Sequence, residues 1–385
     1  MKGKHFLAII GAVTVINLIS RMIGYFREML VGFQFGFSFQ ADSIVTAYTI
    51  PNFLYIVLGG ALTSAFVSVY SKIEDPEKKK TYLQNLFGWL SIAMIILTLV
   101  FVFFSNDIIP FIFRDAPETI DLTVSLFAIM APATIFLILS MWLQGLLNVN
   151  DRFSIAAMST LIMNGSFVLI AFIFFPMAGS YAHAYGALVS AILMFIFLVV
   201  YNYRKGFFTF KPTLGHSPEV WRTFRLTVPI MLGGATLQLY FLIYRIFGAH
   251  LDEGTITALN ITSKFVQLPQ TVLMMAVTAV IFPMLARKVA ASEHESVSKI
   301  HGQGLRLMAL ASYLPPSLSY FMQRKFSSRF SNTKISLGKT RSSLYLCYKY
   351  SSSVCSSTLQ MCILPDFITH MSAQSIRLLS ALSQY

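Results

Sequence analysis

The chain has 385 residues, of which 56% are hydrophobic and only 12% charged, and its formal net charge is +13. A soluble domain carries about 25% charged residues, so the composition excludes an ordinary soluble protein. A nucleic-acid-binding protein would also be basic. Here, however, most Lys and Arg lie in short segments between long apolar runs, which is typical of membrane proteins. We therefore expect an all-α, polytopic membrane protein without a nucleic-acid partner.

The first apolar run covers residues 6–37 and is too long for a cleavable signal peptide. It also carries Arg21, Arg27 and Glu28, so we expect a first spanning helix that stays in the protein. A helix needs roughly 20 apolar residues to cross a bilayer, and several further runs reach that length. The eight predicted spans cover residues 6–34, 42–70, 83–104, 122–147, 154–175, 183–203, 226–247 and 257–285.

The distribution of basic residues between these spans predicts their orientation. With the N-terminus in the cytoplasm, 15 Lys or Arg fall on the inner side and only Arg114 falls on the outer side. Inner loops of membrane proteins are enriched in Lys and Arg, so the split supports both this orientation and the number of spans. The expected location is the bacterial cytoplasmic membrane, crossed several times, with membrane lipids as partners.

The composition changes near residue 312. The last 74 residues hold 18 Ser, eight Lys or Arg, and all three cysteines. The cysteine spacings fit no metal site, so we predict neither a metal nor another cofactor. The tail is either a Ser-rich basic extension or, the interpretation that we favour, out-of-frame sequence. Under the second interpretation the chain is truncated. Composition alone therefore divides the chain into the apolar residues 1–311 and an aberrant tail at 312–385.

Four basic residues fall inside predicted spans: Arg21, Arg27, Arg245 and Lys264. A charge at the bilayer centre costs about 2.5–3.5 kcal/mol on insertion scales, so such residues usually face protein or a water-filled cavity. Arg21 and Arg27 are offset by about 120° and about 9 Å along a helix, and both can border one wide cavity.

A guanidinium group can bind phosphate with paired donors, so Arg21 and Arg27 are candidates for an anion site. The structural alternative is an ion pair with Asp42 or Glu28, or extension of the side chain to the membrane surface. For Lys264 the cavity and the surface are equally plausible. For Arg245 extension to the surface is favoured, and His183 is expected at the membrane interface.

Residues 1–311 contain no Walker A loop, HExxH or GxSxG motif, and the loops are too short to hold a catalytic domain. We therefore expect a protein that is not an enzyme.

Two segments, SRMIGYFREMLVGFQFG (20–36) and ADSIVTAYTIPNFL (41–54), resemble the opening of the MurJ/MviN lipid II flippases. Ala65-Phe66-Val67, the segment 228–238 and the segment 263–287 are also similar to that family, and the resemblance runs from about residue 5 to 311. It implies a two-lobed exporter with 14 helices, which moves undecaprenyl-diphosphate-linked disaccharide-pentapeptide outward by alternating access. The resemblance also implies the domains of this chain: a complete first lobe of six spans at 1–215, the start of a second lobe at 216–311, and the aberrant tail at 312–385.

By position, the resemblance implies that Arg21, Arg27, Asp42 and Lys264 bind the substrate. Lys264 keeps the charge of the family's eighth-helix Arg but loses its forked donors. The stretch FLYIVLGGALTS (53–64) lacks the Arg and Glu that the family often has there, which puts substrate contacts from this helix in doubt.

The predicted function is lipid II flipping, impaired in this truncated form, with cell-wall synthesis enzymes as further candidate partners. Two alternatives stay open. The chain could export another polyprenyl-linked glycan, or it could be a non-transporting membrane scaffold of cell-wall synthesis, for which the buried arginines would be dispensable.

Overall fold

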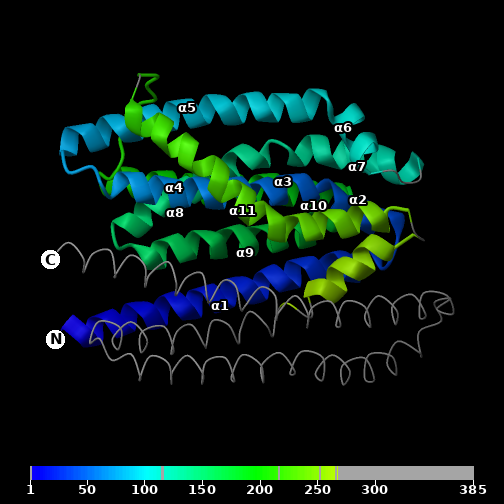
Figure 1. Ribbon diagram of the computed structural model, residues 1–385. Coiled ribbons are helices and arrows are strands. Elements are labelled where there is room, and N and C mark those ends of the chain that lie inside the picture. The colour runs from blue at the N-terminus through cyan, green and yellow to red at the C-terminus, as the bar shows by residue number, and fades with distance from the viewer. Residues whose placement is uncertain (1, 114–116, 216, 251–252, 265–266, 268–385) are drawn as a thin grey trace, which may run out of the picture. The chain divides into compact units, whose positions relative to one another are not determined.

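The computed structural model describes residues 2–113, 117–215, 217–250, 253–264 and 267, and every regular element in this part of the chain is a helix (Figure 1). Residues Met1–Thr257 form one compact unit, and Ala258–Tyr385 form a second. The elements are α1 (Lys2–Phe35), α2 (Phe39–Ala47), α3 (Thr49–Leu54), the π-helix η1 (Tyr55–Gly59), α4 (Gly60–Tyr70), α5 (Pro76–Phe103), α6 (Ser105–Ile112), α7 (Pro117–Met130), α8 (Ala133–Val149), α9 (Phe153–Ala178), α10 (Tyr181–Arg204) and α11 (Pro218–Gly248).

Several of these helices can cross a membrane. By length and composition, four helical segments of the described chain qualify, and two bent pairs raise the number to six. α1, although 34 residues long, is not among them. Of the predicted eighth span, residues 257–264 and 267 are helical and the rest lies outside the described residues, as does the tail. The prediction of an all-helical, polytopic membrane protein is confirmed, with fewer qualifying spans than the eight expected.

The second predicted span is one helical column broken near its start. α2 ends at Ala47 and α3 begins at Thr49, because Pro51 has no N–H to donate to the Ala47 carbonyl one turn earlier. The π-helical turn η1 then joins α3 to α4. Such breaks in membrane helices commonly lie next to functional sites. This one positions most of the polar contacts described below.

The two Gly-Gly pairs of the chain have different roles. A Cβ at Gly59 would come within 2.6 Å of the Met141 sulfur, so this glycine allows η1 and α8 to pack closely. Among the described residues nothing lies within 4 Å of a Cβ placed at Gly233 or Gly234, but a bend of 52° separates 218–236 from 238–248 just beyond them. Close packing therefore explains the first pair, while the second lies beside a bend.

Two apolar clusters form the core of the helix bundle. In the first, the fully buried Trp142 of α8 packs against the Phe66 and Phe87 rings at centroid distances of 6.0 and 5.8 Å. The second gathers around Phe127 and Met130 of α7, both fully buried. Apolar residues also cover the outside of α9, where Phe172 and Ile173 are more than half exposed, as expected for a surface that faces lipid.

The segment between α10 and α11 is fixed to the bundle rather than free. The Asn85 side-chain oxygen accepts hydrogen bonds from the Thr213 hydroxyl at 2.5 Å and from the Gly215 N–H at 3.1 Å. Phe208 packs on Trp142, and the backbone of Thr213 lies directly against Gly88. This linker therefore lies along α5 and covers the first apolar cluster.

Candidate functional site

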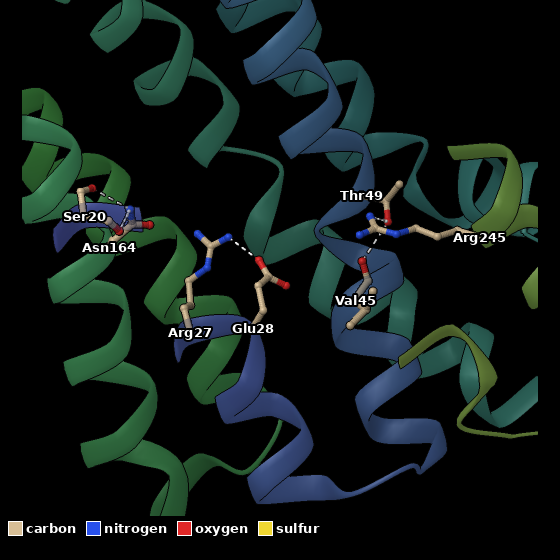
Figure 2. A network of polar contacts seen from close by, with 7 residues as sticks. All are labelled: Ser20, Arg27, Glu28, Val45, Thr49, Asn164 and Arg245. Carbon is tan, nitrogen blue, oxygen red and sulfur yellow. Dashed lines mark hydrogen bonds and ion pairs between the residues drawn. The ribbon is translucent and has the colours of Figure 1, made fainter. Parts of the chain in front are cut away.

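Arg27 lies between two aromatic rings inside the bundle. Its guanidinium carbon is 5.2 Å from the Tyr48 ring centroid and 4.9 Å from that of Phe167. Nη2 donates to the Glu28 carboxylate at 2.6 Å, and the two side chains are only 12% and 18% exposed (Figure 2). The predicted alternative of an ion pair with Glu28 is therefore present. Cation–π contacts and this ion pair together hold the charge in an apolar layer.

Arg21 lies on the same helix, two turns earlier, and is exposed. The preceding residue, Ser20, is buried against α9, where the Asn164 side chain donates to the Ser20 carbonyl at 3.2 Å and to its hydroxyl at 3.1 Å (Figure 2). Gly24 faces the same residue: a methyl group in place of its hydrogen would lie 3.4 Å from the Asn164 amide nitrogen. Gly24 therefore allows α1 and α9 to pack closely beside the exposed Arg21.

Asp42 is 4% exposed and fully engaged. Its carboxylate accepts hydrogen bonds from the Gly254 N–H at 2.7 Å, the Thr257 N–H at 2.8 Å and the Thr257 hydroxyl at 2.6 Å. Gly254 has φ of +84° and its α-carbon faces Phe37, so a side chain there would be strained and would clash. Asp42 thus accepts from backbone N–H groups at a helix start and ties residues 254–257 to α2.

A second contact lies beside this one. The Glu253 carboxylate accepts a hydrogen bond of 2.7 Å from the Phe39 N–H, at the first turn of α2. We call the contacts of Phe39 and Asp42 with Glu253, Gly254 and Thr257 the polar latch. Because the latch occupies both oxygens of Asp42, this carboxylate acts here in closing one end of the bundle.

Lys264 is half-buried in the helical residues 255–264 and makes polar or electrostatic contacts of its own. It belongs to the second compact unit, whereas Arg21, Arg27 and Asp42 belong to the first. Within the first unit, the predicted residues do not form one cluster. Arg27 sits between aromatic rings, Arg21 is exposed, and Asp42 is bound in the latch.

One expectation about polar residues is wrong. Arg245 does not extend to the surface: it is 8% exposed, and its Nη1 donates to the Thr49 hydroxyl at 2.7 Å. His183 lies in the first turn of α10, where its predicted place at the membrane interface stays a prediction, and within the protein it is fully buried, with Nε2 2.6 Å from the Gln34 side-chain oxygen. Both side chains find partners more than 140 positions away in the sequence, and burial with a hydrogen bond is then favoured over exposure.

The break between α2 and α3 brings two of the basic residues near each other. Tyr48 contacts Arg27. The next residue, Thr49, binds Arg245, as Figure 2 shows. The spacing of residues in the sequence did not single out Thr49, Gln34 or His183 as partners. The only available signal for the break was Pro51 inside an apolar run.

The arrangement suits binding of an anion rather than covalent chemistry. Arg27 and Arg21 offer guanidinium donors, and a phosphate oxygen could replace the Glu28 carboxylate on Arg27. Among the described residues, no group of three or more His, Cys, Asp or Glu could hold a metal ion.

Comparisons with known proteins agree with the membrane fold and extend it. The family model "Lipid II flippase MurJ" matches residues 33–326, which is beyond the predicted limit of the resemblance at residue 311. The probable lipid II flippase MurJ of Buchnera aphidicola (Acyrthosiphon pisum) is 25% identical over 323 residues, 82% of this chain and 63% of that protein. The chain spans about 60% of the length of the first such relatives.

Solved structures show the same fold. A lipid II flippase MurJ in an inward closed conformation superposes with a TM-score of 0.74 at 23% identity, covering 88% of this chain and 71% of that one. A multidrug resistance MATE family transporter of the MOP superfamily, in an inward-facing conformation, gives a TM-score of 0.60 at 14% identity, covering 90% and 75%. With a family match over most of its length, this chain belongs to the lipid II flippase MurJ family.

Proposed function

We propose that the chain moves lipid II, the polyprenyl-diphosphate-linked precursor of peptidoglycan, across the bacterial cytoplasmic membrane by alternating access. The observation that carries the proposal is Arg27. It is a largely buried guanidinium group held in an apolar layer by two aromatic rings and one carboxylate, in a chain of the MurJ family.

The chemistry of the cargo explains why such a residue would be useful. A diphosphate must cross a layer in which charge is strongly disfavoured, and a cationic wall lowers that barrier. Glu28 keeps Arg27 neutralised while no substrate is bound. An incoming phosphate would displace Glu28 and take over its hydrogen bond of 2.6 Å. Arg21, exposed on the same helix, would provide a second donor during entry, and Lys264 a third cation.

The orientation of the chain is part of the proposal. We place the N-terminus in the cytoplasm, as the loop charges predict, so that the polar latch around Asp42 lies at the outer side. The bundle would then be closed outward by the latch, and the substrate would enter from the cytoplasmic side. Cell-wall synthesis enzymes are the partners that such a transporter would supply.

The proposal is tested in bacteria whose own lipid II flippase can be depleted. Cells that express this chain should continue to expose lipid II at the outer surface, measured by its accessibility to an external modifying enzyme. Accumulation of lipid II inside, at the level of empty-vector cells, would contradict transport by this chain. Sequence composition predicts impaired transport by the 385-residue form, and the same assay decides that prediction.

A matched pair of variants separates transport from scaffolding. Arg27→Ala should abolish exposure of lipid II, while Arg204→Ala, at an exposed position at the end of α10, should not. A scaffold would tolerate both. Repeating the assay with another polyprenyl-linked glycan distinguishes lipid II from the alternative cargo.

A further inference from the structure

Arg245 of α11 binds the second span at its break. Its Nη1 donates to the Thr49 hydroxyl at 2.7 Å, and the same hydroxyl donates to the Val45 carbonyl at 2.8 Å (Figure 2). A hydroxyl has one proton and two lone pairs. Because the proton of Thr49 is used on Val45, a lone pair faces Arg245. The hydrogen bond to the Val45 carbonyl therefore orients the Thr49 hydroxyl so that it can accept from Arg245. Both hydrogen bonds depend on the position of this carbonyl in the last turn of α2.

The position suits a cation. The last carbonyls of a helix carry partial negative charge, and α2 ends at Ala47, directly beside Thr49. The Tyr244 ring centroid lies 5.8 Å from the guanidinium carbon. A buried charge is tolerated only where such groups replace its water. Arg245 is therefore stable at 8% exposure only while α11 lies on the broken part of the second span.

The polar latch lies on the same span as Thr49, about two helical turns away. Asp42 and Phe39 of α2 hold residues 253–257, and Thr49 holds Arg245. If α11 and residues 253–257 moved away from the second span, both sets of hydrogen bonds would break. The buried Asp42 carboxylate would lose its donors, and Arg245 would lose the Thr49 hydroxyl while still in an apolar layer.

We propose that Arg245 is a positioning residue that holds this end of the bundle closed, by binding the break in the second span only when α11 packs on it. Separation of α11 then requires that water reach the guanidinium group. The inference deepens the proposed transport function, because it names the group that sets the ratio of closed to open forms. Its test measures that ratio directly and needs no transported substrate.

The test uses two spin labels and pulsed electron paramagnetic resonance. The labels replace Phe111 of α6 and Phe247 of α11, which are 83% and 69% exposed, in the full chain with Cys347, Cys355 and Cys362 changed to Ser. Thr49→Val keeps the shape of the side chain and removes the acceptor. A hydrogen bond to a charged group is strong enough that its loss should shift the ratio of separated to closed forms by about tenfold.

Three controls make the result specific. Thr49→Ser keeps the hydroxyl and should restore the distance distribution of the unchanged chain. Thr63→Val is the same substitution on the same helical column, but the Thr63 hydroxyl bonds only Gly59 and Met141 carbonyls within α1–α10, so it should have no effect. Arg245→Gln should match Thr49→Val, and the double variant should shift the ratio no further than either single one.

Labels at Phe111 and Phe172, both within α1–α10, report on the integrity of the bundle itself. Their distance should be the same in every variant. The proposal is overturned if Thr49→Val leaves the distance from Phe111 to Phe247 unchanged. It is equally overturned if the effects of Thr49→Val and Arg245→Gln on the ratio add in the double variant. A third contrary result would be a Phe111–Phe172 distance distribution that broadens together with the Phe111–Phe247 distribution.

Discussion

Tyr48 and Thr49 are consecutive residues, yet they contact two different arginines: the Tyr48 ring lies 5.2 Å from the guanidinium of Arg27, and the Thr49 hydroxyl accepts from Arg245 at 2.7 Å. Successive side chains of a helix point about 100° apart, so these two residues at the junction of α2 and α3 can face different neighbours. A candidate substrate residue and a closing contact thus share one short segment. A displacement of α11 that moves Thr49 would therefore also move the adjoining Tyr48, which contacts Arg27.

The ion pair of Arg27 with Glu28 predicts competition with the substrate. Glu28→Gln removes the negative charge but keeps an oxygen of similar position, so the guanidinium group becomes more available to phosphate. We expect the Kd for lipid II to fall about tenfold, as for one charge-assisted hydrogen bond regained. Binding of fluorescent lipid II to the purified chain in detergent measures this, with Glu118→Gln at the exposed start of α7 as the control. An unchanged Kd in Glu28→Gln would show that Glu28 does not compete.

The polar latch predicts the protection of a few backbone amides. Asp42→Asn replaces one acceptor oxygen by an NH₂ group, so one of the N–H groups of Gly254 and Thr257 loses its partner. Hydrogen exchange of the segment 253–257 should accelerate by roughly tenfold or more, since bonds to a carboxylate contribute about 1.5–3 kcal/mol. Asp107→Asn, on the exposed side of α6, should leave this segment unchanged. Equal exchange rates in the two variants would mean that Asp42 does not hold the latch.

The hydrogen bonds between Asn164 and Ser20 are expected to contribute modestly to the free energy of unfolding. Polar contacts between membrane helices contribute on average about 0.6 kcal/mol and at most about 1.7. We expect Asn164→Leu to lower the free energy of unfolding in detergent by about 1 kcal/mol, and Ser20→Ala to add little in the Leu variant. Ser166→Ala is a suitable control, because the Ser166 hydroxyl bonds only carbonyls of its own helix. Strict additivity of the Asn164 and Ser20 effects would indicate that they do not interact across α1 and α9.

The docked linker predicts opposite effects of two Gly→Ala substitutions. At Gly88 a methyl group would collide with the Thr213 carbonyl, which belongs to backbone and cannot give way cheaply. Gly88→Ala should therefore loosen residues 205–217 and raise their rate of limited proteolysis severalfold. At Gly165 nothing lies within 4 Å, so Ala should stabilise α9 by up to about 1 kcal/mol through helix propensity. Similar protease resistance of both variants would argue against docking of the linker.

Much of the fold follows from local patterns in the sequence. Apolar runs predicted most of the spans, and Pro51 within the second run was the local signal for its break. α5 begins at Pro76, before the predicted residue 83, because Asp75 caps it by accepting from the Glu77 N–H at 3.0 Å. The Asp75-Pro76 pair is also a local signal of a helix start. A prediction from hydropathy misses it, because the first turn of α5 is charged.

The candidate site was less accessible to prediction, for a physical reason. Spacing identified Arg21 and Arg27, and Glu28 was an obvious neighbour. The partners of Arg245 and His183, in contrast, are separated from them by 196 and 149 positions and exist only because helices pack together. A sequence shows that a charged residue inside an apolar span would be costly to expose to lipid. It does not show which distant residue forms the hydrogen bond that offsets this cost.

Arg27 is the residue that we propose carries the diphosphate of lipid II through the apolar layer. The most direct measurement is the rate at which lipid II in one leaflet of a vesicle becomes accessible at the other, with purified wild-type chain, Arg27→Ala or Arg204→Ala. We predict similar rates for wild type and Arg204→Ala, and a rate at least about tenfold lower for Arg27→Ala, as expected for the loss of one charge-assisted contact. Equal rates for all three proteins, or transport by none, would contradict this role of Arg27.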